Sequence, residues 1–353
     1  MCASFVSAGR FTGQQLSKKL SILDLRRSGI SILDRLVLEE ALLRHDPLQR
    51  CWAIVGTHEP THNRLVHVNN EKIQNQISQN PNANKNCAIV LGIGGKPQDL
   101  LNLDLIQRDS ILCIKRFSGG GTVVVDHSSL FTTFIGRSGE GQLLTNVDPY
   151  PRDIMQWTAD MIFEHVFDEM NRDLLDVGSS KKKNRPSLVV DSKSCGMENS
   201  GEIVSFPRDE NLKSLNEMPK FALRENDYVF DERKMGGSAQ SIVKGGWLHH
   251  TSFLWDYESN HMEYLTLPSK RPDYRGDRSH EDFLVKLKTY YNSLKHGKHV
   301  FFDTVKDISA NVFDVEEVTL QEALALIDSE LGGMQKWFDG KCRTRIIDFD
   351  SLK

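Results

Sequence analysis

The sequence predicts an α+β fold, with one large unit of strands and helices and a small α/β unit at the C-terminus. Two long segments carry apolar residues at three- and four-residue spacings, which is typical of amphipathic helices. Around them lie short segments rich in β-branched and aromatic residues, which favour strands. The chain of 353 residues is also long enough to bury one large core and a smaller companion.

In the first half of the chain, one helix precedes several strands. The segment ILDRLVLEEALLRH, residues 32–45, has helical apolar spacing and predicts an amphipathic helix. The polar stretch 67–85 is expected to be a surface excursion, and 153–175 should form the clearest long helix. The expected strand segments are CWAIVGT from Cys51, CAIVLGIGG from Cys87, SILCIKRF from Ser110 and TVVVDHSSLFTTFIG from Thr122.

The second half changes character twice. Residues 178–220 contain KKKNRPS, several serines and little periodicity, which favours an exposed, flexible insertion. FALRENDYVF and KMGGSAQSIVKGGWLHHTSFLWDY then predict paired strands. After Pro268, RPDYRGDRSHEDFLVKLKTYYNSL and TLQEALALIDSEL predict two helices, with a short strand at VFDVEEV. We therefore expect residues 23–267 to form the main domain and 268–353 a small accessory domain.

Composition excludes several classes of function. The net charge of -4 and the pI near 6.3 provide no overall positive field for nucleic acid. No apolar run approaches the roughly 18 to 20 residues that span a bilayer, so we expect no membrane insertion. The six cysteines include no CxxC pair, which argues against a zinc site or a redox dithiol and favours a reducing compartment.

The N-terminal segment, 1–22, has a composition of its own. It contains no Asp or Glu, is rich in Ser and carries Arg10, Lys18 and Lys19. This pattern resembles an organellar transit peptide more than a secretory leader. We expect a mitochondrial location, with the cytoplasm as the alternative.

Three consecutive glycines interrupt a strand-rich segment, KRFSGGGTVVVD, residues 115–126. Glycine weakens a strand, so its use here indicates either a turn with positive φ angles or a close approach of the backbone to a ligand. Arg116 precedes the run, and a guanidinium can grip a carboxylate or phosphate with two parallel hydrogen bonds. The basic pair and the glycines could therefore act on one anion, whereas a flexible hairpin turn is the alternative interpretation.

A second cluster of small and polar residues lies in the second half of the chain. Such residues are costly inside strands unless they face a site. Its members are Asn226, Asp227, Lys234, Gly236, Gly237, Ser238, Gln240, His249 and His250. Because neighbouring residues of a strand face opposite sides, only one of the two histidines can point into a pocket.

These segments, SGGGTVVVD after Lys115-Arg116, NDYVFDERKMGGSAQ and HHTSFLWD, resemble the catalytic domain of lipoate-protein ligases, within the biotin and lipoate ligase superfamily. The resemblance covers roughly residues 23 to 265 apart from the insertion. It implies a mixed β-sheet with flanking helices, and the C-terminal segment is similar in size to the accessory domain of the larger ligases. It also implies a two-step reaction. Lipoate or octanoate and ATP, with magnesium, would form an acyl-adenylate and pyrophosphate, and the acyl group would then pass to a lysine of an acceptor domain.

The resemblance implies a role for each matching residue. Lys234 would be catalytic, contacting the carbonyl and phosphate oxygens of the adenylate and stabilising the negative charge that develops there. Arg116 would hold the carboxylate or phosphate, and Asn226 and Asp227 would lie beside the magnesium ion. Further ligand-contacting residues would be Ser118, Gly119, Gly120, Gly121, Thr122, Asp126, Gly237, Ser238, Ala239, Gln240 and His250. Asp126 is either such a site residue or a residue at the end of a hairpin.

At three positions the sequence departs from the family pattern. Val125 stands where the family has His, Ser129 where it has Asn, and Thr251 where it has Gly. These changes bear on substrate choice and on activity. Val125 and Ser129 favour one alternative, a non-catalytic acyl-binding homologue. The other alternative, within the same superfamily, is an ATP-independent octanoyl or lipoyl transferase.

An octanoyltransferase of one class would need a cysteine nucleophile. Cys113 lies in an apolar strand segment and Cys195 lies in the insertion, so neither occupies a convincing position. For a ligase, the resemblance implies two kinds of acceptor, the apo lipoyl domains of 2-oxoacid dehydrogenase complexes and the glycine cleavage carrier protein.

Overall fold

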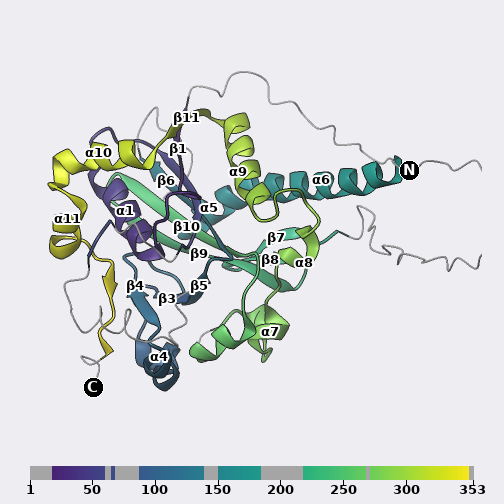
Figure 1. Cartoon of the computed structure of the whole chain (residues 1–353), viewed down its shortest axis with the longest axis horizontal. Helices are drawn as coiled ribbons and strands as arrows, with labels where there is room; N and C mark the ends of the chain where they lie inside the picture. Colours follow the sequence, from purple (N-terminus) through teal and green to yellow (C-terminus); the bar gives the residue numbers. More distant parts are fainter. Residues whose placement is uncertain are drawn as a thin grey trace, which may run out of the picture.

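Two mixed β-sheets with flanking helices build the molecule (Figure 1). The computed structural model describes residues 18–59, 65–67, 87–138, 150–183, 218–267 and 271–349. Within these ranges the predicted α+β class is confirmed, and so are the strand segments expected before and after the long central helix. Among the described residues, no helix combines the length and the apolar content needed to cross a bilayer.

The larger sheet has eight strands and carries the second polar cluster. In spatial order they are β11 (Asp314–Val318), β1 (Lys19–Asp24), β2 (Trp52–Thr57), β6 (Ser129–Arg137), β10 (Gly246–Leu254), β9 (Arg233–Val243), β8 (Asp227–Phe230) and β7 (Phe221–Arg224). Strand β1 runs parallel to β11 and to β2, whereas the other neighbours are antiparallel. Strands β9 and β10 form a long hairpin through Gly245, whose φ of 84° suits a residue without a side chain.

The smaller sheet carries the glycine run. Its strands, in spatial order, are β12 (Arg345–Ile346), β4 (Leu112–Lys115), β3 (Cys87–Leu91) and β5 (Val123–Asp126). Strands β3 and β4 are parallel, and the connection between them contains α3 (Pro97–Leu100) and α4 (Leu103–Asp109). The chain leaves β4, passes through the glycines into β5, and then turns into β6 of the larger sheet. The glycine run therefore lies where the two sheets meet.

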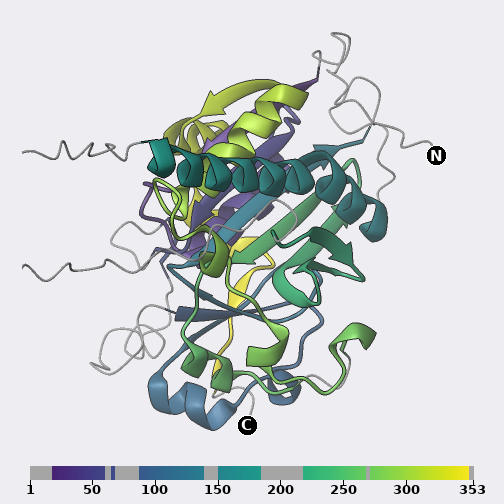
Figure 2. The same ribbon diagram turned by 90° about the vertical axis from the view of Figure 1, so that its right-hand side faces the viewer.

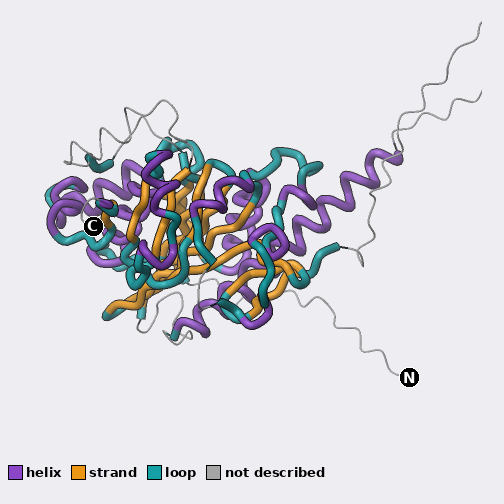
Figure 3. Tube along the Cα trace, turned by 90° about the horizontal axis from the view of Figure 1, so that it is seen from below, coloured by secondary structure: helices purple, strands orange, loops and turns teal. Residues whose placement is uncertain are grey.

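Helices cover both faces of the larger sheet (Figure 2). One face packs against a long helical segment and α9 (His299–Val312); the long segment comprises α5 (Pro151–Thr158), the π-helical turn η1 (Ala159–Phe163) and α6 (Glu164–Lys183). The other face packs against α1 (Ile32–His45), α10 (Leu320–Leu331), α11 (Met334–Gly340) and the smaller sheet. On its outer side the smaller sheet carries α4 and the 3₁₀ turn η3 (Ser259–Tyr264). The strands thus lie between helices, as the tube in Figure 3 shows.

Helix α1 has the predicted bounds but not the predicted amphipathic character. It begins after Ser31, whose hydroxyl accepts a hydrogen bond from the Asp34 amide in a capping box. Its residues from Ile32 to Leu43 are all buried, because α10 and α11 cover the side that faces away from the sheet. The interior of the molecule therefore includes charged side chains of this helix, which hydrogen bonds and ion pairs must satisfy.

The C-terminal segment shares both sheets with the rest of the chain. Strand β11 pairs with β1 and β12 pairs with β4, and the buried residues of α9, α10 and α11 belong to the cores on the two faces of the larger sheet. The expected accessory unit, 268–353, thus has no separate sheet among the described residues, and its boundary stays a prediction. The first of its two expected helices is replaced by short turns, namely η4 (Asp273–Arg275), α7 (His280–Phe283) and α8 (Lys288–Tyr291). Helix α10 confirms the second, and α9 was not predicted.

Three predicted segments lie largely outside the described residues. Of the expected transit peptide, 1–22, the structure describes only the end, where residues 19–22 belong to β1 and bury Leu20 and Ile22 in the core. Of the expected insertion, 178–220, the first residues continue α6 to Lys183, and 184–217 lie outside the described ranges together with Cys195. The expected surface excursion, 67–85, falls outside them except for His67.

Glu40 of α1 fastens the C-terminal tail. Its buried carboxylate accepts hydrogen bonds from the Arg343 and Thr344 amides, from the Thr344 hydroxyl and from Arg44. Glu40→Gln puts an amide nitrogen, which cannot accept, among these donors. We expect the free energy of unfolding to fall by about 1 to 3 kcal/mol in urea denaturation. Glu316→Gln, on the exposed face of β11, is the matched control, and an equal midpoint for both variants would contradict this role.

Candidate active site

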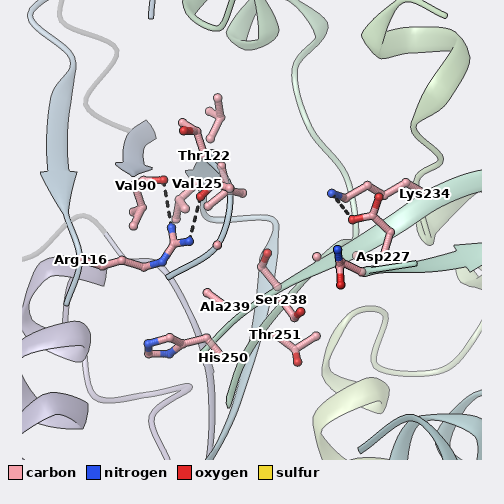
Figure 4. A pocket seen from close by; sticks show the side chains of 18 of the residues that line it. Val90, Arg116, Thr122, Val125, Asp227, Lys234, Ser238, Ala239, His250 and Thr251 are labelled. Atoms are coloured by element: carbon pink, nitrogen blue, oxygen red, sulfur yellow. Dashed lines mark hydrogen bonds and ion pairs between the residues drawn. The ribbon is translucent and has the colours of Figure 1, made fainter. Parts of the chain in front are cut away.

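A cavity of about 630 Å³ opens between the two sheets (Figure 4). The larger sheet lines it with β8, β9 and β10, the smaller sheet lines it with the segment around the glycines, and α1 also contributes to its wall. Of the residues singled out in the sequence, the cavity is lined by Arg116, Gly119, Gly120, Gly121, Thr122, Asn226, Asp227, Lys234, Gly237, Ser238, Ala239, Gln240 and His250. The fold thus brings together two motifs that lie far apart in the sequence, while the role of each residue stays a prediction.

The glycine run is needed for close approach between the two sheets. Gly120 has a φ of 106°, and a Cβ atom there would lie 2.8 Å from the Arg116 guanidinium and 2.9 Å from the Ser238 carbonyl oxygen. The Gly119 amide donates to the Gln240 carbonyl at 2.8 Å, which joins the loop to β9. Gly121, in contrast, has open space where its side chain would be. The run therefore combines a backbone contact that excludes side chains with an open position on the cavity wall.

Arg116 organises this loop from within. Its guanidinium donates to the carbonyl oxygens of Gly119 and Gly121 at 2.9 and 2.8 Å, to the Val90 carbonyl and to the Ser118 hydroxyl. The prediction that Arg116 grips a ligand anion with two parallel bonds does not fit this geometry, because four of its five donors are engaged by the protein. Burial lowers the pKa of Arg116 to about 10, so the side chain remains charged at neutral pH.

Lys234 and Asp227 form an ion pair on the opposite wall. The Lys234 ammonium lies 2.6 Å from Asp227 Oδ1, and the two residues come from the neighbouring strands β9 and β8. Asp227 is buried, whereas 28% of the Lys234 side chain is exposed, toward the cavity. The pair thus presents a cation to whatever binds there. A cation in a partly dry pocket can stabilise negative charge far better than one in water.

Asn226 and Asp227 are the predicted metal-binding pair. Asn226 is exposed and lines the cavity, and Asp227 uses its two oxygens for Lys234 and for the Tyr274 hydroxyl. Among the described residues, no cluster of three or more His, Cys, Asp or Glu side chains could hold a metal ion alone. An ionised carboxylate has about four acceptor sites, so Asp227 can accept a further contact beside these two partners. One carboxylate and one amide oxygen suit magnesium when phosphate oxygens and water complete its shell. The pair therefore fits a magnesium ion that arrives with a nucleotide.

Two predicted ligand contacts lie away from the cavity. The Asp126 carboxylate accepts from the Ser128 amide and the Ser129 hydroxyl, and the Ser129 hydroxyl accepts from the Asp126 amide. Of the two interpretations of Asp126, these contacts support a residue at the end of a hairpin. Ser118 is fully buried and faces Arg116. Of the three positions that depart from the family pattern, Val125 and Thr251 line the cavity. Ser129 instead accepts a hydrogen bond within the turn that follows Asp126.

The two adjacent histidines face opposite sides of β10, as predicted. His250 lines the cavity, and its Nδ1 lies 3.0 Å from Glu39, which also pairs with Arg35 at 2.7 Å. Burial, opposed by the charge of Glu39, lowers the pKa of His250. Figure 4 shows His250 and Lys234 well apart in the pocket. No sequence signal assigned Arg35 and Glu39 to the site, because α1 was expected to expose its charged side chains to solvent.

His249 is buried on the side of β10 that faces away from the cavity, and its burial predicts how the stability of the protein depends on pH. Its ring lies between Tyr228 and Gln240, and burial lowers its pKa to about 3. The unfolded chain, in which the pKa is near 6.5, then binds a proton that the folded state excludes. Stability should therefore fall as the pH drops below about 6.5, by about 2 kcal/mol at pH 5 from this residue alone. Urea denaturation at pH 7.5 and 5 should show a smaller loss for His249→Gln, and an equal loss would contradict this account.

Residues beyond position 267 complete the cavity wall. Pro272, Arg275, His280, Phe283 and Leu284 all line it. Arg275 is buried, and its Nη2 finds no hydrogen-bond partner in the described part of the chain. These residues were not predicted as site residues, because they lie beyond the expected domain boundary at 267. The dense run of Arg, Asp and His in RPDYRGDRSHED is the sequence signal that indicates them.

The chain is similar in sequence to one named protein and in fold to solved structures. The inactive lipoate–protein ligase 2 of Plasmodium falciparum is 26% identical over 325 residues, which cover 87% of this chain and 74% of the relative. The crystal structure of a lipoate-protein ligase A bound with ATP aligns with a TM-score of 0.50 at 16% identity, covering 92% of this chain and 96% of that one. A bipartite lipoate-protein ligase of Thermoplasma acidophilum, described with its E2 lipoyl domain, has a TM-score of 0.50 at 14% identity, with 92% and 93% covered. At these identities the two structures show a shared fold.

A family model adds a match along the sequence itself. The model of the lipoyl protein ligase A/B catalytic domain matches residues 82–314, which is more than half of the chain. The matched region contains the glycine run, the second polar cluster and the turns that close the cavity. The chain belongs to the lipoyl protein ligase A/B catalytic-domain family.

Proposed function

We propose that the protein is an ATP-dependent ligase that activates lipoate or octanoate as an acyl-adenylate and transfers the acyl group to a lysine of a lipoyl-type acceptor domain. The observation that carries the proposal is the Lys234–Asp227 ion pair, placed in one cavity with the glycine loop. A cation held in place by a buried carboxylate is suited to stabilise the charge that develops on phosphate oxygens during adenylate formation.

Each part of the cavity has a task in such a reaction. Attack of the acyl carboxylate on the α-phosphate of ATP would form the acyl-adenylate and release pyrophosphate. Negative charge concentrates on phosphate oxygens in this step, and Lys234 would stabilise that charge. Gly121 leaves room for the acyl-adenylate to lie against the backbone, since nothing in the described structure occupies the space of its missing side chain. Arg116 would keep the loop in shape through the carbonyl oxygens of Gly119 and Gly121, and so act on the ligand through the loop.

ATP and magnesium are the implied cofactors. Asn226 and Asp227 would hold the magnesium ion, which when bound neutralises charge on the phosphates of ATP. Lys234 and Arg275 both bring positive charge to the cavity wall near Asp227 and His280, where a polyphosphate would be drawn. A neighbouring structure, the lipoate-protein ligase A described above, is bound with ATP, which supports this choice for the present chain.

A non-catalytic acyl-binding protein is the second candidate. Two observations favour it: the relative from Plasmodium falciparum is named inactive, and Val125 places an apolar side chain on the cavity wall where the family pattern has His. Such a protein would bind the acid without splitting ATP. The two candidates therefore differ in one measurable step.

Exchange of labelled pyrophosphate into ATP tests this step without any acceptor. The full chain is incubated with magnesium, ATP, labelled pyrophosphate and either lipoate or octanoate, and binding of the acid is measured in parallel by calorimetry. The ligase predicts exchange that requires the acid. Binding of the acid with no exchange would overturn the ligase and favour the binding protein.

A further inference from the structure

The segment that follows the larger sheet reaches back to the Lys234–Asp227 pair. Residues 271–287 pack against the β8–β9 hairpin, where the Val285 amide donates to the Lys234 carbonyl at 2.8 Å. Arg278 ties the same segment down by donating to the carbonyl oxygens of Tyr274 and Glu232 at 2.6 and 2.9 Å. These bonds fix the position of Tyr274 relative to the hairpin that carries the pair.

The side chain of Tyr274 reaches the pair through its hydroxyl. This hydroxyl donates to Asp227 Oδ2 at 2.9 Å, while the Lys234 ammonium lies 2.6 Å from Oδ1 of the same carboxylate. The ring is held by the guanidinium of Arg224, 4.6 Å from its centroid, and packs against Phe283. The two oxygens of Asp227 are thus assigned to different partners on different segments.

The direction of this hydrogen bond is fixed by its surroundings. The Tyr274 hydroxyl carries the proton of this contact, because a carboxylate in an ion pair with an ammonium accepts hydrogen bonds and donates none. The hydroxyl therefore donates, and the carboxylate accepts. A carboxylate held at one oxygen cannot rotate freely, so its other oxygen keeps its direction.

Lys234 needs such a fixed partner. Its side chain is flexible and 28% exposed, and without a partner the ammonium could occupy many positions in the cavity. A displacement of about 1 Å in a catalytic group can cost about 100-fold in rate. The precision of the cation thus depends on the orientation of Asp227.

We propose that Tyr274 is a positioning residue of this site, which orients Asp227 through its hydroxyl and thereby places the Lys234 ammonium for acyl-adenylate formation. The inference rests on the proposed ligase function and extends it to a residue outside both polar motifs. Tyr274 touches neither the acid nor the nucleotide in this account. It acts through Asp227 alone.

A double-mutant cycle tests the proposal. Acid-dependent pyrophosphate exchange is measured for the full chain and for Tyr274→Phe, Asp227→Asn and the double variant, with Tyr257→Phe as the matched control. Tyr257 lies in the same apolar cluster, but its ring packs under the Lys286 ammonium instead. We expect Tyr274→Phe to lower the maximal exchange rate about 10-fold with KM values changed less than about 2-fold, and to have little further effect in the Asp227→Asn background. Tyr257→Phe should behave like the wild type.

The four proteins of the cycle are also compared by urea denaturation, which requires no activity. There, too, the effects of Tyr274→Phe and Asp227→Asn should be non-additive, so the contact is tested even if the wild type exchanges no pyrophosphate. Additive effects in both measurements, or a Tyr274→Phe rate equal to that of the wild type, would overturn the proposal. An inactive wild type with non-additive unfolding would instead overturn the ligase function, and with it the catalytic role of Tyr274, and leave the contact established.

Discussion

Lys234→Ala is expected to lower the rate of acyl-adenylate formation about 100- to 1000-fold, which corresponds to about 3 to 4 kcal/mol in the barrier. The substitution removes the cation that Asp227 holds 2.6 Å away in the cavity. It also leaves the buried Asp227 carboxylate without its counter-charge, so the unfolding free energy has to be measured beside the rate.

Lys244→Ala is the control for this variant. Lys244 lies at the exposed end of the same β9–β10 hairpin, and its loss should leave the rate unchanged. The measurement is pyrophosphate exchange at saturating ATP and acid. A folded Lys234→Ala protein with more than about one tenth of the wild-type rate would show that the ammonium is not the main source of charge stabilisation.

Gly120→Ala should produce the largest loss of stability among single changes in the loop. A Cβ atom at this position would lie 2.9 Å from the Ser238 carbonyl oxygen and 3.1 Å from the Ala239 Cα, and these backbone atoms cannot move aside cheaply. The φ of 106° adds strain for any residue with a side chain. Together we expect a loss of about 2 to 5 kcal/mol in the free energy of unfolding.

Gly121→Ala is the matched control for Gly120→Ala, because Gly121 has open space where a Cβ atom would lie. Its unfolding midpoint in urea should stay close to that of the wild type, while its added methyl group enters the cavity where the acyl-adenylate would lie. If the two variants lost equal stability, the glycine run would be a plain flexible turn. The close contact between Gly120 and β9 would then contribute nothing specific to the free energy of unfolding.

Most of the fold was predictable because its local patterns are strong. The β9–β10 hairpin, the strands around the glycine run and the long α5 to α6 segment all follow from apolar and β-branched spacing. The buried outer face of α1 could not be predicted, since the helices that cover it, α10 and α11, come from the opposite end of the sequence. The segment after Pro272 has helical spacing, yet Val285 and Leu287 donate their amides to β9 and β10, and this tertiary pairing replaces the helix.

The candidate site, like the fold, could be predicted only in part. Glycines and polar residues clustered in strands are locally unusual, so Gly120, Lys234 and Asp227 could be found in the sequence alone. What a side chain contacts could not be found there. Arg116 was expected to bind an anion but donates to the carbonyl oxygens of its own loop. Tyr274 donates to Asp227, although the whole β9–β10 hairpin separates these two residues in the sequence.

The mass of an acceptor domain tests the central claim most directly. An apo lipoyl domain is incubated with the full chain, magnesium, ATP and lipoate, beside one reaction without ATP and one with Lys234→Ala, and its intact mass is then recorded. The ligase predicts a gain of one lipoyl group that needs both ATP and Lys234. No gain in any reaction, with lipoate binding to the wild type still detectable by calorimetry, would contradict it.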